Sequence, residues 1–257
     1  MTTENKLSQA LPVPEQQTLS RSIVLHLLPG VLILLFYLFT ARTTLKMGFP
    51  PMMALLVAIA VVLIPFELGY VLYQGKKQHG KISISGVILY REHLQWWYYL
   101  ILGSILFLWL GFAFRVLAKP IDTFFIDKMF RWVPDWFFLL GPHNDLSGFS
   151  KSALLITAIM AIVFNGIAGP VVEEIYFRGY LLPRISRLNG WAPLLNLLLF
   201  SLYHLFTPWQ NLVRIIGFVP MVYSVWWKRN IHLGMIVHCA GNMVGSIGML
   251  VMVLNRS

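Results

Sequence analysis

The chain has 257 residues, of which 58% are hydrophobic and only 12% charged, which excludes an ordinary soluble domain and predicts a polytopic membrane protein. Its formal charge of +10 would suggest a nucleic-acid partner in a soluble protein, but the Lys and Arg residues mostly flank apolar segments, so we expect membrane anchoring and no nucleic-acid site. The single cysteine, Cys239, excludes an intramolecular disulfide and a cysteine-based zinc site.

The first two apolar segments, at residues 22–41 and 49–73, are each long enough to cross the ~30 Å hydrocarbon core as a helix. Residues 1–21 are polar, and we expect them to form a disordered tail ahead of a single membrane domain at 22–257. Glu67 lies near the end of the second segment. It could reach the interface or pair inside the bundle, and its position favours the interface.

A basic loop at residues 74–93 precedes the third apolar segment, which spans 96–114 and opens with four aromatic residues. Aromatic residues in this position are typical of the headgroup region. Residues 115–150 mix charged and aromatic side chains, which favours a helix lying on the membrane surface. The same segment could instead cover the mouth of a site.

The second half of the chain predicts four further spans. The first, at 152–187, contains Pro170, which is expected to bend it. The others lie at 191–206, 212–227 and 231–254. In the last of them, Gly241 and Gly245 form a small-xxx-small pair that predicts close helix packing. We therefore expect an all-α polytopic membrane bundle of about seven to eight helices, one of them on the surface if residues 115–150 lie flat.

Two adjacent acids interrupt this apolar half of the chain. Glu173 and Glu174 are the only acids after Asp145, and ionisable residues inside a membrane segment indicate a functional site. Neighbouring residues on a helix lie about 100° apart, so the two carboxylates face different directions, while Glu174 and Arg178, at i and i+4, can pair. Glu173 is then free to face a cavity. The alternative is a helix end at the interface, where these charges simply reach water.

Three later polar residues come to a comparable depth if neighbouring helices are antiparallel. At ~1.5 Å per residue from the shared membrane face, Glu173 and His204 lie roughly 20 Å deep, His238 roughly 10 Å and Asn242 roughly 17 Å. His238 and Asn242, at i and i+4, project from one face of their helix. Taken singly, a histidine near a helix end is more often interfacial, and an asparagine can hold two helices together. Together they indicate one polar site.

The residues of this site form three short motifs: Glu173-Glu174-x-x-x-Arg178, Phe200-x-x-x-His204 and His238-x-x-x-Asn242. In this order they resemble the motifs of the CPBP intramembrane proteases, also called the ABI family, which are relatives of the type II CAAX-prenyl endopeptidases and of bacteriocin-immunity proteins. The resemblance covers about residues 150–250. It implies an intramembrane endopeptidase, and nothing in the first 150 residues names its substrate.

The resemblance also implies a role for each matched residue. Glu173 and His204 would activate a water molecule, His238 and Asn242 would polarise the carbonyl and hold the oxyanion, and Glu174 and Arg178 would order the site. None of the matched motif positions is a serine or a cysteine. Direct attack by water, without an acyl-enzyme, is therefore expected.

Three alternatives are left open. A zinc ion could be held by Glu173, His204 and His238 with water as the fourth ligand, although no His-Glu-x-x-His is present and we favour a mechanism without a metal or other cofactor. A non-catalytic protein of the bacteriocin-immunity type, or a partner-binding scaffold, could use the same cavity. A transporter is less favoured because no internal repeat is visible. The expected partners are the lipid bilayer and a peptide or membrane-protein substrate, and the expected location is the cell membrane of a prokaryote.

Overall fold

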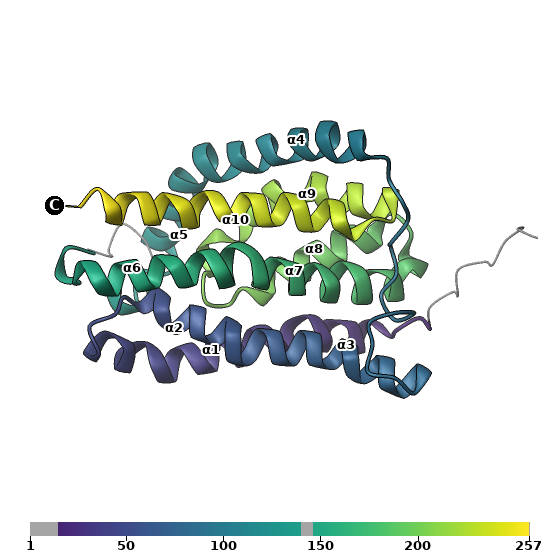
Figure 1. Ribbon diagram of the computed structural model, residues 1–257, viewed down its shortest axis with the longest axis horizontal. Coiled ribbons are helices and arrows are strands. Elements are labelled where there is room, and N and C mark those ends of the chain that lie inside the picture. The colour runs from purple at the N-terminus through teal and green to yellow at the C-terminus, as the bar shows by residue number, and fades with distance from the viewer. Residues whose placement is uncertain (1–14, 140–145, 257) are drawn as a thin grey trace, which may run out of the picture.

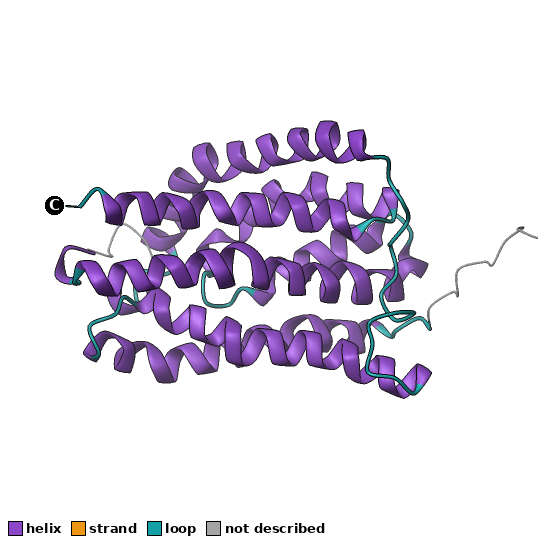
Figure 2. Cartoon of the chain, viewed as in Figure 1, coloured by secondary structure: helices purple, strands orange, loops and turns teal. Residues whose placement is uncertain are grey.

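The computed structural model describes residues 15–139 and 146–256, and every regular element in these two ranges is helical (Figures 1 and 2). Apart from three single-turn helices, η3 (Asp135–Phe137), η4 (Leu146–Gly148) and η8 (Pro208–Gln210), the described elements form seven continuous runs. The first three are α1 (Leu19–Lys46); α2 (Pro51–Ala58) with η1 (Ile59–Leu63) and α3 (Ile64–His79); and α4 (Trp96–Phe112) with η2 (Ala113–Leu117) and α5 (Ala118–Lys128). The other four are α6 (Lys151–Met160) with η5 (Ala161–Ala168), α7 (Gly169–Glu173), η6 (Glu174–Leu181) and η7 (Leu182–Leu188); α8 (Trp191–Tyr203); α9 (Asn211–Lys228); and α10 (Ile231–Leu254). The predicted all-α bundle is confirmed.

Five of these runs are long and apolar enough to cross a membrane: Leu19–Lys46, Pro51–His79, Trp96–Lys128, Lys151–Leu188 and Ile231–Leu254. The chain is therefore a multi-pass integral membrane protein. Most of the tail predicted at 1–21 lies outside the described residues, and α1 already begins at Leu19.

The two segments predicted as the fifth and sixth spans differ from the others. Helix α8 has 13 residues and rises only ~20 Å, which is too short for a ~30 Å hydrocarbon core. The chain leaves the helix at His204, turns through η8 (Pro208–Gln210) and returns as α9. Figure 1 shows this turn within the length of the bundle and not at its end. Irregular backbone at such depth is tolerated where protein surrounds it or where it lines a cavity.

The fourth run, Lys151–Leu188, carries the two acids and is one continuous helix, as predicted. It contains π-helical stretches on both sides of Glu173, namely η5 before it and η6 after it. Pro170 has no N–H for a helical hydrogen bond, and the wider winding of η5 just before it accommodates that loss. Stretches of π-helix are common at functional sites.

No separate surface helix forms in the described part of residues 115–150. The third run instead continues through the π-helical stretch η2 into α5, which packs against η8 and α9. Ile126 is buried in this contact region, and Gln210 donates to the carboxylate of Asp122 over 3.4 Å. These tertiary contacts override the surface pattern of the sequence. Helix α5 thus packs against the turn that follows His204.

Two glycines allow the helices around the acids to approach closely. A Cβ on Gly30 of α1 would lie 2.0 Å from the carbonyl oxygen of Tyr203, at the end of α8. A Cβ on Gly234 of α10 would lie 2.6 Å from Oε2 of Glu174. Both distances are far below van der Waals contact, so only glycine fits at either position without displacing α8 or the carboxylate.

Candidate functional site

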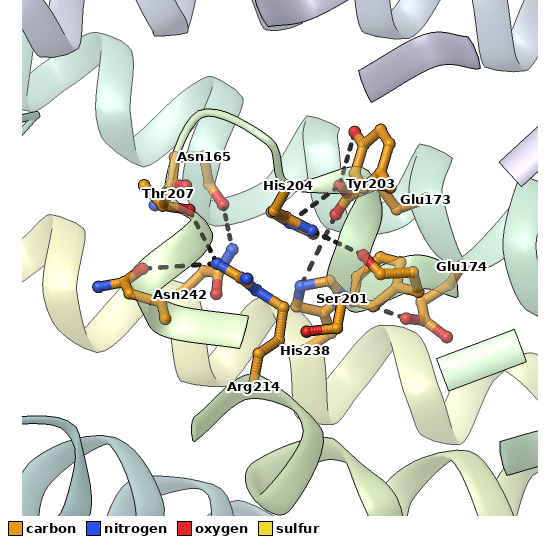
Figure 3. Close-up of polar contacts among 12 residues, drawn as sticks. Asn165, Glu173, Glu174, Ser201, Tyr203, His204, Thr207, Arg214, His238 and Asn242 are labelled. Atoms are coloured by element: carbon orange, nitrogen blue, oxygen red, sulfur yellow. Dashed lines mark hydrogen bonds and ion pairs between the residues drawn. The ribbon is translucent and has the colours of Figure 1, made fainter. Parts of the chain in front are cut away.

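Glu173 and Glu174 are both buried and point in different directions, as the 100° spacing predicts. Glu174 has no exposed surface, and its Oε1 lies 3.3 Å from Nη1 of Arg178, which is equally buried. This is the predicted pair at i and i+4. Glu173 is 6% exposed and faces two histidines from other helices (Figure 3).

The carboxylate of Glu173 lies between two imidazole rings. Its Oε1 is 3.8 Å from Nε2 of His204, and its Oε2 is 3.7 Å from Nε2 of His238. Both separations are too long for a direct hydrogen bond, but a single water molecule can bridge each of them. Tyr203 donates from its hydroxyl to Oε1 of Glu173 over 3.1 Å, which orients the carboxylate.

Each histidine is held through its other ring nitrogen. Nδ1 of His204 lies 2.9 Å from the carbonyl oxygen of Phe200, and Nδ1 of His238 lies 3.0 Å from Oε1 of Glu174. A carbonyl oxygen and a carboxylate only accept, so Nδ1 carries the proton in both rings. Nε2, which faces Glu173, is then the acceptor nitrogen of a neutral ring and a second donor when the ring is protonated.

Phe200, from the second motif, joins the first and third motifs. Its ring lies under the guanidinium of Arg178 at 3.9 Å and edge-on to the ring of His238 at 6.0 Å. A cation over an aromatic face is favourable, particularly where water is excluded. The aromatic residue of the second motif thus stabilises the buried cation that holds Glu174 and, through Glu174, His238.

Asn242 does not join the cluster of Glu173 and the two histidines. Its amide nitrogen donates to the backbone carbonyl of Asn165 over 3.0 Å, and both residues line a cavity of about 900 Å³ together with Gln210. Phe218 lines the same cavity and lies against the ring of His238, with 4.8 Å between centroids. Asn242 therefore lines the same cavity as Phe218, which contacts the ring of His238.

On one side, the rest of this cavity is lined by η2 and the end of α4. On the other side, it is lined by the face of α10 that carries Gly241 and Gly245, the predicted packing pair. A Cβ on Gly241 would lie 2.5 Å from the side chain of Leu110, so the expected packing is present there. Gly245 has nothing within 4 Å of such a Cβ and lines the open cavity. The packing expected at Gly245 is therefore wrong, because α10 borders the cavity at this position and not another helix.

Glu67 does not reach the interface as expected, and its side chain is fully buried. The second run continues to His79, so Glu67 lies well inside the helix and not near its end. It lies on α3, which packs against α7 and η6, the elements that carry Glu173 and Glu174, and neither of its oxygens has a hydrogen-bond partner among the described residues. An acidic residue within an apolar segment could have indicated that Glu67 belongs to the site. The sequence analysis instead placed the end of the second span at residue 73, which put Glu67 near the interface.

Arg214 is a second residue for which the sequence analysis gave no role. It is 6% exposed, and its guanidinium donates to Asn211 Oδ1 at 2.9 Å, to Thr207 Oγ1 at 3.0 Å and to Gln210 Oε1 at 3.4 Å (Figure 3). These contacts hold the irregular turn that follows His204. An arginine within the apolar segment at 212–227 was the available signal.

The three residues of the zinc alternative are Glu173, His204 and His238. Within residues 15–139 and 146–256, no group of three or more His, Cys, Asp or Glu side chains has an arrangement that could hold a metal ion. The roles proposed below are those of the chain's own side chains, and the chelator experiment decides the zinc alternative.

The fold and this cluster define a multi-pass membrane protein with acid and base groups inside the helix bundle. Residues 155–244 match the family model Rce1-like, described as type II CAAX prenyl endopeptidase Rce1-like. The match confirms the resemblance to the CPBP and CAAX proteases, and it covers all three motifs but not the first 154 residues. At the level of the family, it supports an endopeptidase that acts on a peptide or protein in the membrane. No curated protein and no solved structure matches the chain.

Proposed function

We propose that the protein is an intramembrane endopeptidase that cleaves a peptide bond by direct attack of a water molecule held at Glu173. The observation that carries this proposal is the position of the Glu173 carboxylate between the Nε2 atoms of His204 and His238, at 3.8 Å and 3.7 Å. A water molecule in either gap would contact a carboxylate and an acceptor nitrogen at once. That is the environment in which a proton can be removed from water as it attacks.

The contacts support the role that the resemblance implies for each residue. Glu173, helped by the free Nε2 of His204, takes the proton of the attacking water. His238 is oriented by Glu174, which Arg178 holds in turn, so its ring is fixed before substrate arrives. Fixed polar groups in a site that excludes water stabilise developing charge without reorganising.

Asn242 is proposed to hold the oxyanion, as the resemblance implies. One N–H of its amide is used by Asn165, which leaves the second N–H for a substrate oxygen at the cavity wall. A peptide carbonyl next to Asn242 would also be near His238, one helical turn away on α10, which donates to it when Nε2 carries a proton. The substrate is a peptide or a membrane protein segment, and we place the enzyme in the cell membrane of a prokaryote.

The test compares the purified wild-type protein with Glu173→Ala and His204→Ala in liposomes. Each is incubated with a membrane-protein fraction, and new peptide termini are counted by mass spectrometry. We expect the wild-type protein to generate new termini and each variant to lose at least ~100-fold in rate, since a positioned acid or base contributes about 10²–10⁴-fold. Controls are Glu92→Ala, whose side chain is 48% exposed, and His232→Ala, an exposed histidine of α10.

Three outcomes of this experiment separate the alternatives. Full activity of both variants in a folded state would show that the enzyme mechanism is wrong. Activity that disappears in a strong chelator and returns with zinc would favour the metal-dependent mechanism, whereas we expect activity to persist. A non-catalytic immunity factor or scaffold would produce no new termini with any variant, while its binding to a partner would survive.

A further inference from the structure

Pro170 lies inside the continuous helical run Lys151–Leu188. Just before it, the run is wound as a π-helix, in which each N–H bonds to the carbonyl oxygen five residues earlier, and the N–H of Gly169 donates to Phe164 in this way. The next donor in the same register would be Pro170, which has no N–H. The carbonyl oxygen of Asn165 is therefore left without its helical donor.

The donor that this carbonyl receives comes from another helix. The side-chain amide of Asn242, on α10, donates to the carbonyl oxygen of Asn165 over 3.0 Å (Figure 3). A side-chain amide is planar and carries two N–H bonds, so a hydrogen bond to one of them fixes the direction of the other. The second N–H is the one proposed above for the substrate oxyanion. The freed carbonyl thus sets the direction of the proposed oxyanion donor.

Two other prolines inside helices show the same compensation. Pro29 of α1 leaves the carbonyl oxygen of Leu25, four residues earlier, without a helical donor, and the hydroxyl of Tyr176 donates to that oxygen over 2.7 Å. Pro220 of α9 has the same effect on Ile216, whose carbonyl oxygen accepts an indole N–H from α4 over 3.1 Å. Inside a membrane bundle, a carbonyl that proline frees has to find a donor in a neighbouring helix. The bond between Asn165 and Asn242 is therefore one case of a rule that this chain follows elsewhere.

A second link joins the same two elements through side chains. The amide of Asn165 donates to Oγ of Ser246 over 3.3 Å, and this Oγ lies 3.2 Å and 3.1 Å from the carbonyl oxygens of Ala161 and Asn242. Ser246 is one helical turn beyond Asn242 on α10. The side-chain link does not depend on Pro170, so substitutions can separate it from the link to the freed carbonyl.

We propose that Pro170 is a positioning residue for the oxyanion donor: by removing one backbone N–H it frees the carbonyl of Asn165, which holds the amide of Asn242 in its working orientation. The inference rests on the proposed function. With an N–H at position 170, the helix would supply its own donor to this carbonyl, and the amide of Asn242 would lose its acceptor and rotate. A donor that is already oriented stabilises an oxyanion without reorganising, and a rotating one does not.

The kinetic test uses Pro170→Ala, which restores the backbone N–H with a good helix former. The substrate is a fluorogenic peptide built on a cleavage site found by the mass spectrometry described above. We expect kcat to fall about 10- to 100-fold at unchanged KM, because the oxyanion donor loses its orientation. The melting temperature should not fall, since the helix gains a hydrogen bond. The matched control is Pro220→Ala, the same substitution at a proline whose freed carbonyl accepts from Trp109 and not from Asn242, and it should keep the wild-type kcat.

Two further variants separate positioning from a general effect on the helix. In the double variant of Pro170→Ala with Asn242→Ala, no amide remains to be oriented, so kcat should be no lower than in Asn242→Ala alone. Asn165→Ala keeps the backbone carbonyl and loses only the link to Ser246, so it should lower kcat less than Pro170→Ala does. The proposal is overturned by wild-type kcat in Pro170→Ala, by penalties that multiply in the double variant, or by a loss in Asn165→Ala as large as that in Pro170→Ala.

Nuclear magnetic resonance of the protein with isotope-labelled asparagine tests the orientation without any substrate. The side-chain amide signal of Asn242 is identified by its absence in Asn242→Ala. One of its two protons should show the weak temperature dependence of a hydrogen-bonded proton, and this difference should disappear in Pro170→Ala and persist in Pro220→Ala. Two equally exposed protons in the wild-type protein, or an unchanged signal in Pro170→Ala, would overturn the proposal. If Pro170→Ala does not fold, Pro170→Ser supplies the same N–H and takes its place in both experiments.

The failure of this inference is distinguishable from failure of the proposed function. If Glu173→Ala abolishes cleavage while Pro170→Ala changes neither kcat nor the amide signal, only the positioning role of Pro170 is wrong. If Glu173→Ala cleaves as well as the wild-type protein, the proposed function is wrong, and the amide signal alone decides whether Pro170 orients Asn242.

Discussion

Arg178 is the residue through which the charged part of the site is held together. It is fully buried, pairs with Glu174 and lies over the ring of Phe200. Removing one member of a buried ion pair leaves the other charge uncompensated, which typically costs about 3–5 kcal/mol. We therefore expect the motif arginine to be needed for folding as well as for the proposed catalysis.

We predict that Arg178→Met lowers the free energy of unfolding by about 3–5 kcal/mol, because Glu174 then keeps a buried charge without a partner. Thermal unfolding in detergent, followed by intrinsic fluorescence, measures the loss. Arg187→Met, at an exposed position of η7, should leave stability within about 0.5 kcal/mol of wild type. The double variant Glu174→Gln with Arg178→Met should recover much of the stability but not the activity, because His238 loses its carboxylate. A double variant no more stable than Arg178→Met alone would contradict this explanation.

At the scale of the elements, the spacing of residues along the chain predicted the directions of side chains on a single helix. Where helices end and how they pack depends on tertiary contacts, which the spacing does not show. The pairing of Glu174 with Arg178 and the different direction of Glu173 follow from helix geometry alone. The position of Glu67 and the short length of α8 do not, because both depend on where a helix ends. An apolar pattern continues through Phe206, but the helix stops at Tyr203, where the following turn is held by Arg214 from α9. That contact is not visible in the pattern of a single segment.

The approach of α1 to the end of α8 is an element-scale contact that can be tested. A Cβ on Gly30 would lie 2.0 Å from the carbonyl oxygen of Tyr203, so Gly30→Ala must push α8 away and displace His204 from Glu173. We predict a loss of about 1–3 kcal/mol in stability, as is typical of overpacking, and a fall in proteolytic activity. The control is Gly69→Ala on α3, where a Cβ meets nothing within 4 Å and helix propensity favours alanine by about 1 kcal/mol. Equal stability of the two variants would show that α1 does not position the site.

At the scale of the whole molecule, the cavity of about 900 Å³ is lined by parts of α4, η2 and α10, and by Phe218, which contacts the ring of His238. The family match begins at residue 155, so the wall formed by α4 and η2 lies outside the matched segment. The motifs could therefore predict the charged cluster but not the space beside it. The first three runs, which carry no motif residue, supply Glu67, Gly30 and one wall of the cavity.

If the substrate enters through this cavity, filling it should block cleavage without unfolding the protein. Gly245 lines the cavity and has nothing within 4 Å of a Cβ, so Gly245→Leu places a large side chain in the proposed path. We predict at least a tenfold fall in kcat/KM with unchanged or slightly higher stability, because leucine is the better helix former. Gly248→Leu is the matched control, since Gly248 lies on the same helix, is equally open and does not line the cavity. Equal kcat/KM for the two variants would mean that substrate reaches Glu173 by another route, and a loss in both would point to a general effect on α10.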